Sequence, residues 1–260
     1  MKLHVEVSGS GEPLLLIHGL GSASTAWKPL LPALTSHFQV ITIDLPGHGQ
    51  SPLEHGTHLD PESLARLILT YLDQVNISRV HVVGNSLGGW VALELAALAP
   101  ERVKSVVGLA PAGLWLKPDI TRVRGEARAR LMAKTLHKSA PKLLRYKFAR
   151  QIGFGTVSPQ WDNLEIETCV DATIAMGTSR GYFPTWDAFL GKRFDEKISP
   201  SIPVTIIFGD TDNTLPAHSS QERSLAPAHA KWIVIPQCGH APMWDHPQTV
   251  ISYIEETCRG

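Results

Sequence analysis

The stretch that decides the fold is residues 80–89, which reads VHVVGNSLGG. Residues 80–83 predict a buried strand, and the apolar run that begins at Leu87 predicts a helix. Between them Ser86 stands in a turn, with Gly84 two residues before it and Gly88 two residues after it. A serine placed in this way is the pattern of a nucleophile elbow, a strained turn that holds the hydroxyl above the strand end. Ser86 is therefore the candidate nucleophile.

The glycines of this turn have a steric explanation. In so tight a turn, a side chain at Gly84 or Gly88 would collide with its neighbours, and Gly89 keeps the helix close to the sheet. The helix N-terminus adds backbone N–H groups and a partial positive charge near a developing anion. Because the five-residue pattern also occurs by chance, the rest of the chain has to supply the partners of the serine.

Outward from this stretch, predicted strands and helices alternate along the chain. Such alternation predicts a mostly parallel, doubly wound α/β sheet with helices on both faces. Before the turn and just after it, strands are expected at residues 3–7, 14–17, 40–43 and 103–109, and helices at 24–37, 60–75 and 87–98. After residue 203 the alternation resumes, with strands at 204–208 and 232–235 and helices at 217–225 and 247–257.

Between these two runs the alternation stops. Residues 112–200 contain helical stretches and no clear buried strand. We therefore expect one α/β core of residues 1–113 and 200–260, interrupted by a helical cap of residues 114–199. A chain of 260 residues, 43% hydrophobic and 18% charged, suits one such domain with an insertion.

Bulk composition narrows the possible partners and the compartment. The formal net charge is zero, which does not indicate attraction of the whole protein to nucleic acid. Cys169, Cys238 and Cys258 are too few and too scattered for a disulfide framework or a metal site. The apolar run at 14–17 is far shorter than the ~20 residues of a membrane span, and no signal peptide is recognised. We expect a cytoplasmic protein that is not an integral membrane protein.

Two late loops can supply a base and its orienting acid. One follows the predicted strand 204–208 and contains Asp210 and Asp212; the other follows 232–235 and ends in His240. A neutral imidazole can take the proton of Ser86 and later return it to the leaving group. His240 is chosen for its position after the last strand, whereas spacing alone does not choose between the two aspartates.

The chain resembles the α/β-hydrolase fold superfamily along nearly its full length. Five motifs carry the resemblance in order: HGLG at 18–21, DLPGHGQS at 44–51, GNSLGG at 84–89, GDTD at 209–212 and GHAP at 239–242. The resemblance implies that Asp212 is the orienting acid. It also implies an oxyanion hole formed by the backbone N–H groups of Leu20 and Leu87. His18 and His48 would then belong to supporting structure.

The elbow sequence resembles those of small esterases, lactonases, cofactor-free haloperoxidase-like enzymes and C–C bond hydrolases of aromatic degradation. The leading interpretation is a serine hydrolase of a carboxylic ester or lactone, with Ser86, Asp212 and His240 as catalytic residues. A C–C hydrolase is the alternative, although a tryptophan is associated with the position that Ala241 occupies here. A third possibility is a ligand receptor that has kept the triad. A serine at the elbow argues against haloalkane dehalogenases, which use aspartate.

The predicted cap is rich in aromatic residues, most of which we expect in its own core. Some would face the serine and favour an apolar acyl or aromatic substrate. Asn85, Phe183 and Trp186 are the candidates for substrate contact. No cofactor is predicted, because the sequence contains no phosphate loop, dinucleotide signature or metal cluster; the group of His55, His58 and Asp60 is interpreted as loop surface.

The charge of the cap is unevenly distributed. Residues 117–150 contain eleven lysines and arginines against two acids, a formal excess of nine positive charges that the rest of the neutral chain balances. The simpler interpretation is a solvated helix whose long side chains cover apolar surface. A sharper hypothesis is that this stretch steers anionic substrates or docks on an anionic surface.

Overall fold

The structure, a computed structural model, describes residues 3–259, except for the side chain of residue 126. A seven-stranded sheet has the order β1-β3-β2-β4-β5-β6-β7, in which only β1 is antiparallel to its neighbour. The strands are β1 Val5–Ser8, β2 Glu12–Ile17, β3 Phe38–Ile43, β4 Val80–Asn85, β5 Val103–Leu109, β6 Val204–Gly209 and β7 Lys231–Ile235. The predicted mostly parallel, doubly wound sheet is confirmed.

Helices cover both faces of the sheet, and alternate residues of the central strands point to opposite faces. In β2, Leu15 and Ile17 pack in one core cluster with α2 Pro61–Gln74 and α3 Leu87–Leu98. Leu14 and Leu16 pack in a second cluster with α11 Pro247–Arg259 and the short α1 Leu31–Leu34. All four of these β2 side chains are fully buried, as expected of a strand covered on both faces.

Two predicted helices are broken in the structure. Residues 24–37 form a 3₁₀ turn, η1 Ser24–Trp27, and then α1, because Pro29 and Pro32 lack the backbone N–H groups that a continuous helix needs. Residues 217–225 form α9 Ala217–Ser220 and the 3₁₀ turn η3 Arg223–Leu225. Between these two the Glu222 N–H donates to the carbonyl of Leu114, and its carboxylate caps η3 at Ser224.

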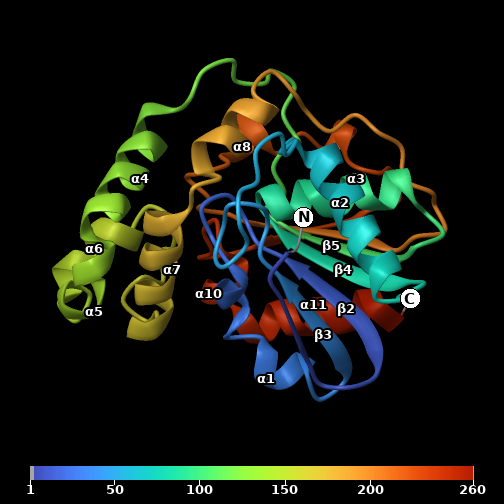
Figure 1. Cartoon of the computed structure of the whole chain (residues 1–260), viewed down its shortest axis with the longest axis horizontal. Coiled ribbons are helices and arrows are strands. Elements are labelled where there is room, and N and C mark those ends of the chain that lie inside the picture. The colour runs from blue at the N-terminus through green and yellow to red at the C-terminus, as the bar shows by residue number, and fades with distance from the viewer. Residues whose placement is uncertain (1–2, 260) are drawn as a thin grey trace.

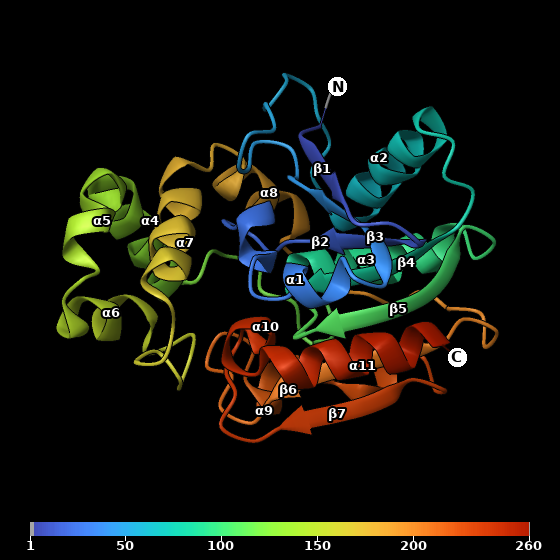
Figure 2. The same cartoon turned by 90° about the horizontal axis from the view of Figure 1, so that it is seen from below.

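Six helical segments lie between β5 and β6, and no strand is assigned in this part of the described chain. They are α4 Arg124–Leu136, η2 His137–Ser139, α5 Ala140–Leu143, α6 Lys147–Phe154, α7 Ile166–Thr178 and α8 Tyr182–Phe189. We call these segments the inserted helices. In Figures 1 and 2, α4 to α7 stand beside the sheet, and the arrowheads of β5 and β7 point toward them in Figure 2.

The inserted segment contacts loops of the α/β core through ion pairs and through the backbone. The Lys28 ammonium, beside η1, lies 2.7 Å from Glu167 and 2.6 Å from Asp171, both on α7. Gly181, just before α8, donates its N–H to the carbonyl of Gly47 at 2.8 Å. Among residues 3–259, no helix is both long enough and apolar enough to cross a bilayer.

Candidate active site

The turn at Ser86 has the backbone geometry of an elbow. Ser86 has φ +54° and ψ −117°, a positive φ that a residue other than glycine adopts only under strain. Its carbonyl accepts N–H groups from Trp90 at 3.1 Å and from Ala112 at 2.9 Å. These bonds fix the strained residue between β4 and α3, at the carboxyl end of the sheet where ligands of such folds bind.

The flanking glycines are required by close approach of the backbone. A Cβ on Gly84 would lie 2.0 Å from the Gly88 oxygen, and a Cβ on Gly88 would lie 2.1 Å from the Ile17 oxygen. Neither contact can be relieved by rotating a side chain, since both partners are backbone atoms. The elbow can therefore form only with glycine at these two positions.

His240 and Asp212 come together as a buried pair. The Nδ1 atom of His240 lies 2.9 Å from Oδ2 of Asp212, and their side chains are 11% and 0% exposed, respectively. The other carboxylate oxygen, Oδ1, accepts N–H groups from Thr214 at 2.9 Å and Leu215 at 2.8 Å. Since the Asp212 carboxylate accepts at Oδ2, the neutral ring of His240 carries its proton on Nδ1, and Nε2 is left as the basic nitrogen.

The competing carboxylate, Asp210, is used elsewhere. Its Oδ1 accepts the N–H of Cys238 at 3.3 Å, a bond within the loop that leads to His240. Spacing left Asp210 and Asp212 open, and the geometry pairs Asp212 with the imidazole.

Asn85 connects the elbow to the loop of His240. Its side-chain amide donates to the backbone oxygen of Leu109 at 3.0 Å and to that of His240 at 3.1 Å. The residue is buried, and its amide nitrogen is committed to these two carbonyls. We predicted Asn85 as a substrate contact; its hydrogen bonds are those of a positioning residue.

The loop of Leu20 approaches the candidate nucleophile. A Cβ on Gly19 would lie 3.1 Å from Cβ of Ser86, so this backbone passes directly over the elbow. Leu87 is the first residue of α3, where the backbone N–H has no partner within the helix. Within residues 3–259 neither the N–H of Leu20 nor that of Leu87 donates to an acceptor, so both can donate to an oxyanion.

Two buried histidines, His18 and His48, support the loop that contains Leu20. Nε2 of His18 accepts the N–H of Leu45 at 2.9 Å, so Nδ1 is the donor to the Gly19 carbonyl at 2.7 Å. Burial lowers the pKa of His18, and burial together with the neighbouring His18 lowers the pKa of His48 to about 3. Burial therefore favours the neutral form of both rings, in agreement with the acceptor role of Nε2 in His18. His48 lies in the 44–51 turn, with Nδ1 3.0 Å from the Pro46 oxygen.

Sequence reasoning missed two supports of the His240 loop. The carboxylate of Asp245 accepts the N–H of Gly239 at 2.7 Å and also a hydrogen bond from the Ser158 hydroxyl. His240 itself donates its N–H to the carbonyl of Val157 at 2.8 Å. Ser158 and Val157 follow α6, so the inserted segment holds the loop of the candidate base directly. No local pattern in the sequence marks these long-range contacts.

The aromatic residues of α8 lie close to the oxyanion loop. A Cβ on Gly21 would lie 2.7 Å from the ring of Tyr182, which is 2% exposed. Trp186 is also buried and packs edge-on against Tyr182, with ring centroids 5.7 Å apart. The ring of Phe183 is half-buried and lies under the Arg122 guanidinium at 4.3 Å. Tyr182, which we did not single out, is thus the α8 ring in contact with the loop after Gly19.

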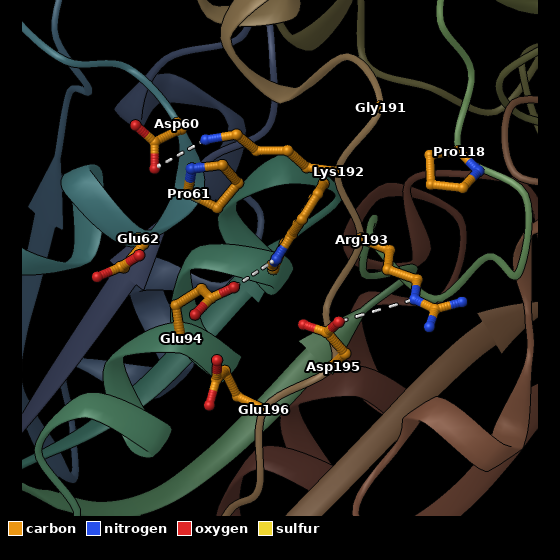
Figure 3. A pocket seen from close by; sticks show the side chains of 11 residues that line it. Asp60, Pro61, Glu62, Glu94, Pro118, Gly191, Lys192, Arg193, Asp195 and Glu196 are labelled. Atoms are coloured by element: carbon orange, nitrogen blue, oxygen red, sulfur yellow. Dashed lines mark hydrogen bonds and ion pairs between the residues drawn. The ribbon is translucent and has the colours of Figure 1, made fainter.

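A separate surface pocket has a cavity volume of about 470 Å³ (Figure 3). Asp60, Glu62, Trp90, Glu94 and Lys192 are among its described lining residues, which do not include Ser86 or His240. Burial raises the pKa of Glu94 to about 7, while its oxygen accepts the Trp90 indole N–H at 2.8 Å. The pocket therefore holds a carboxyl group that is half protonated near neutral pH.

Comparison with known proteins agrees with this architecture. A family model described as the alpha/beta hydrolase fold matches residues 12–247. The chain belongs to this family. The fold that the five motifs implied is thereby confirmed.

Curated relatives resemble either the whole chain or part of it. Over 98% of its length the chain is 26% identical to the pimeloyl-[acyl-carrier protein] methyl ester esterase of Legionella pneumophila, of which it covers 99%. A shorter match has 43% identity over 112 residues. It is to the dihydrolipoyllysine-residue acetyltransferase component of the acetoin cleaving system of Pseudomonas putida, and the chain spans only 30% of that protein's length.

Solved structures with the same fold have different activities. An esterase from Thermogutta terrifontis superposes with a TM-score of 0.75 at 23% identity, over 99% of this chain and 93% of that one. A meta-cleavage product hydrolase from Pseudomonas fluorescens gives 0.72 at 20% identity, over 99% and 94%. An epoxide hydrolase, CorEH, gives 0.77 at 21% identity, over 98% and 94%. At such identities the likeness concerns the fold, and activity has to be argued from the site.

Proposed function

We propose that this protein is a serine hydrolase that cleaves a carboxylic ester or lactone through an acyl-enzyme. Ser86 is the nucleophile, His240 the general base and acid, and Asp212 the group that orients the imidazole. The N–H groups of Leu20 and Leu87 form the oxyanion hole. One observation carries the proposal: His240 makes a buried 2.9 Å contact with Asp212, and a hydrogen bond from Asn85 connects the His240 backbone to the elbow.

Acylation follows from the protonation states of these groups. Nε2 of His240 takes the Ser86 proton as Oγ attacks the carbonyl carbon, and the negative charge that forms on the carbonyl oxygen is held by the two N–H groups. The Asp212 carboxylate stabilises the imidazolium through Nδ1–H. When the tetrahedral intermediate collapses, the bond to the leaving oxygen breaks and that oxygen takes the proton from Nε2. With an ester the alcohol departs, whereas with a lactone the new hydroxyl stays on the acyl chain; in both cases Ser86 carries the acyl group.

Deacylation repeats these steps with water. Nε2 removes a proton from a water molecule, whose oxygen attacks the acyl carbon, and the same oxyanion hole holds the charge. Collapse releases the carboxylic acid and returns the proton to Ser86. Each fixed oxyanion donor contributes roughly 3 kcal/mol of transition-state stabilisation. Every step uses groups of this chain and water.

We further propose that residues 114–199 act as the cap of this site. Val157 accepts the N–H of His240, and Tyr182 lies on the loop after Gly19, so this segment contacts the loops of both the base and the oxyanion hole. Trp186 and Phe183 belong to the same helix as Tyr182. An apolar acyl or aromatic group is the substrate portion that such rings would accommodate.

The test is a turnover screen. Wild type and Ser86→Ala are assayed with p-nitrophenyl esters of increasing chain length, with lactones, and with a vinylogous diketone of the ring-cleavage type. We expect multiple turnovers of esters or lactones by wild type and a loss of roughly 10³-fold or more in Ser86→Ala.

Three results would overturn the proposal, each in a different way. Preferential turnover of the diketone would identify a C–C hydrolase that uses the same serine. Absence of repeated turnover on every substrate would favour a receptor that binds ligands in this site. Full activity of Ser86→Ala would remove the nucleophile itself.

A further inference from the structure

The basic stretch of the inserted helices has no role in the proposed chemistry. Six basic side chains of residues 124–145 are exposed and have no carboxylate within salt-bridge distance among the described residues: Arg124, Arg128, Lys134, Lys138, Lys142 and Arg145. Two others are paired, Arg122 with Asp187 and Lys147 with Asp162. Arg130 is buried and donates to backbone carbonyls, so it is structural.

Large apolar side chains are exposed among these cations. The most exposed on α4 and α6 are Leu131 at 62%, Phe148 at 64% and Ile152 at 67%. Met132, Leu136 and Tyr146 are also exposed. Phe148 and Ile152 are one helical turn apart on α6, and the rings of Tyr146 and Phe148 lie 6.0 Å apart. We call these six apolar and the six unpaired basic residues the outer face.

The outer face is turned away from the sheet. On the opposite side of α4, a Cβ on Gly177 of α7 would lie 2.6 Å from the Ala133 oxygen. Leu144 and Phe154, at the ends of α5 and α6, form one buried cluster with Cys169 of α7. In both views α7 lies between α4 and the sheet (Figures 1 and 2), while Phe154 at the end of α6 packs against Trp244. Docking on the outer face would therefore leave the sheet uncovered.

The residue types of the outer face identify its partner. The cores of protein–protein interfaces are depleted in lysine, whereas here Lys134, Lys138 and Lys142 lie among exposed apolar side chains in α4, η2 and α5. At a lipid surface this mixture is favourable, because bulky apolar groups enter the boundary of the acyl chains. Lysine and arginine stems run along them, and their charges meet the headgroups. Tyrosine at 146 is a residue type enriched at such boundaries. The positive charge selects anionic lipid.

We propose that the outer face docks this protein reversibly on anionic lipid surfaces as a peripheral protein. The attraction is local, because the excess of positive charge in residues 117–150 is balanced elsewhere in a chain of zero net charge. The proposal does not rest on the hydrolase activity, since the outer face contains none of the candidate catalytic residues.

The experiment is flotation of the full chain with unilamellar vesicles, performed in the Ser86→Ala background so that lipid is not consumed. One set of vesicles contains phosphatidylcholine alone, and the other is a mixture with phosphatidylglycerol. We expect binding to the mixed vesicles only, with an affinity that falls as salt is added.

Two sets of substitutions separate the apolar and ionic contributions. Phe148→Ser with Ile152→Ser removes apolar insertion, and at least about a tenfold loss of affinity is expected. Lys138→Gln, Lys142→Gln and Arg145→Gln together should weaken binding roughly 100-fold. The controls are Val7→Ser with Val234→Ser, and Arg66→Gln with Arg79→Gln and Lys197→Gln, exposed residues outside the outer face. These controls should bind as the parent does. All substituted side chains are exposed, and thermal melts verify folding.

Three outcomes would overturn the proposal. One is equal recovery of the protein with neutral and with anionic vesicles, or no recovery with either kind. Another is binding that the outer-face and control substitutions reduce alike. The third is binding to soluble polyglutamate that exceeds binding to vesicles and is insensitive to Phe148→Ser with Ile152→Ser, which would identify an acidic protein partner instead.

Discussion

The side-chain amide of Asn85 donates a hydrogen bond to the backbone carbonyl of His240 at 3.1 Å. The residue that precedes the candidate nucleophile thus holds the loop of the candidate base. The same amide bonds the carbonyl of Leu109 at the end of β5. One buried side chain therefore sets the relative positions of β4, β5 and the loop after β7.

Removing the Asn85 amide should displace the His240 loop, and we therefore expect a larger effect on kcat than on KM. For Asn85→Asp, which keeps the shape but loses the N–H donors, we expect kcat to fall roughly 10- to 100-fold with little change in KM. The free energy of unfolding should fall by about 1–3 kcal/mol, because two buried carbonyls lose a donor. A raised KM with unchanged kcat would instead restore Asn85 as a substrate contact.

The two aspartates of the loop after β6 offer a matched pair of variants. Asp212→Asn should lower kcat by about 10³- to 10⁴-fold, because an amide neither holds the neutral imidazole in the required tautomer nor stabilises the imidazolium that forms. Asp210→Asn changes only a bond to the Cys238 N–H and should stay within roughly tenfold of wild type. Steady-state kinetics on one ester compare them, and the reverse order of effects would assign the orienting role to Asp210.

Glu94 should give the stability of the protein a distinctive pH dependence. Its pKa is raised by burial from 4.5 to about 7, so the folded state retains a proton that the unfolded state has lost between these values. The free energy of unfolding therefore decreases as pH rises through this window and is level above it. Glu94→Gln keeps an acceptor for the Trp90 indole and should remove this contribution, on the order of 2 kcal/mol after allowance for solvent screening.

Urea unfolding of wild type and Glu94→Gln at pH values from about 4 to 8, a range that spans the two pKa values, measures the difference in their free energies of unfolding. Glu62→Gln, an exposed side chain at the same pocket, is the control. A stability difference between wild type and Glu94→Gln that is the same at every pH would show that Glu94 does not titrate in this window.

If the basic stretch also steers substrates, the effect of salt should depend on substrate charge. We expect kcat/KM for an ester bearing a carboxylate to fall as salt is added, while kcat/KM for a neutral ester of similar size stays constant. The triple substitution at Lys138, Lys142 and Arg145 should remove most of that salt dependence. Identical salt responses of the two esters in the wild type would exclude steering.

Much of the fold and of the candidate site is readable from local sequence. Strand, turn and helix at residues 80–89 follow from apolar runs and from glycines that close contacts require. His240 was predicted from its position after the last strand, whereas Asp212 was chosen over Asp210 only through the family resemblance. The predicted helix 24–37 was wrong as one element, because Pro29 and Pro32 interrupt its hydrogen bonding.

What the sequence did not reveal depends on contacts between distant residues. Asp245, which accepts the Gly239 N–H, also accepts a hydrogen bond from the hydroxyl of Ser158, 87 residues earlier in the chain. Tyr182 meets Gly21 because α8 is fastened to the 44–51 turn through Gly181. Neither pairing has a periodic or motif signature, so it has to be observed in three dimensions.

The central claim is that Ser86 carries the acyl group during turnover, and trapping that intermediate tests it most directly. The protein is mixed with p-nitrophenyl acetate, quenched in acid during the first turnovers, digested and mapped by mass spectrometry. We predict one acetyl group on the peptide that contains Ser86, and none at the corresponding peptide of Ser86→Ala, which should also lose turnover. Hydrolysis that continues undiminished in Ser86→Ala, without acetylation of the Ser86 peptide in wild type, would contradict the account.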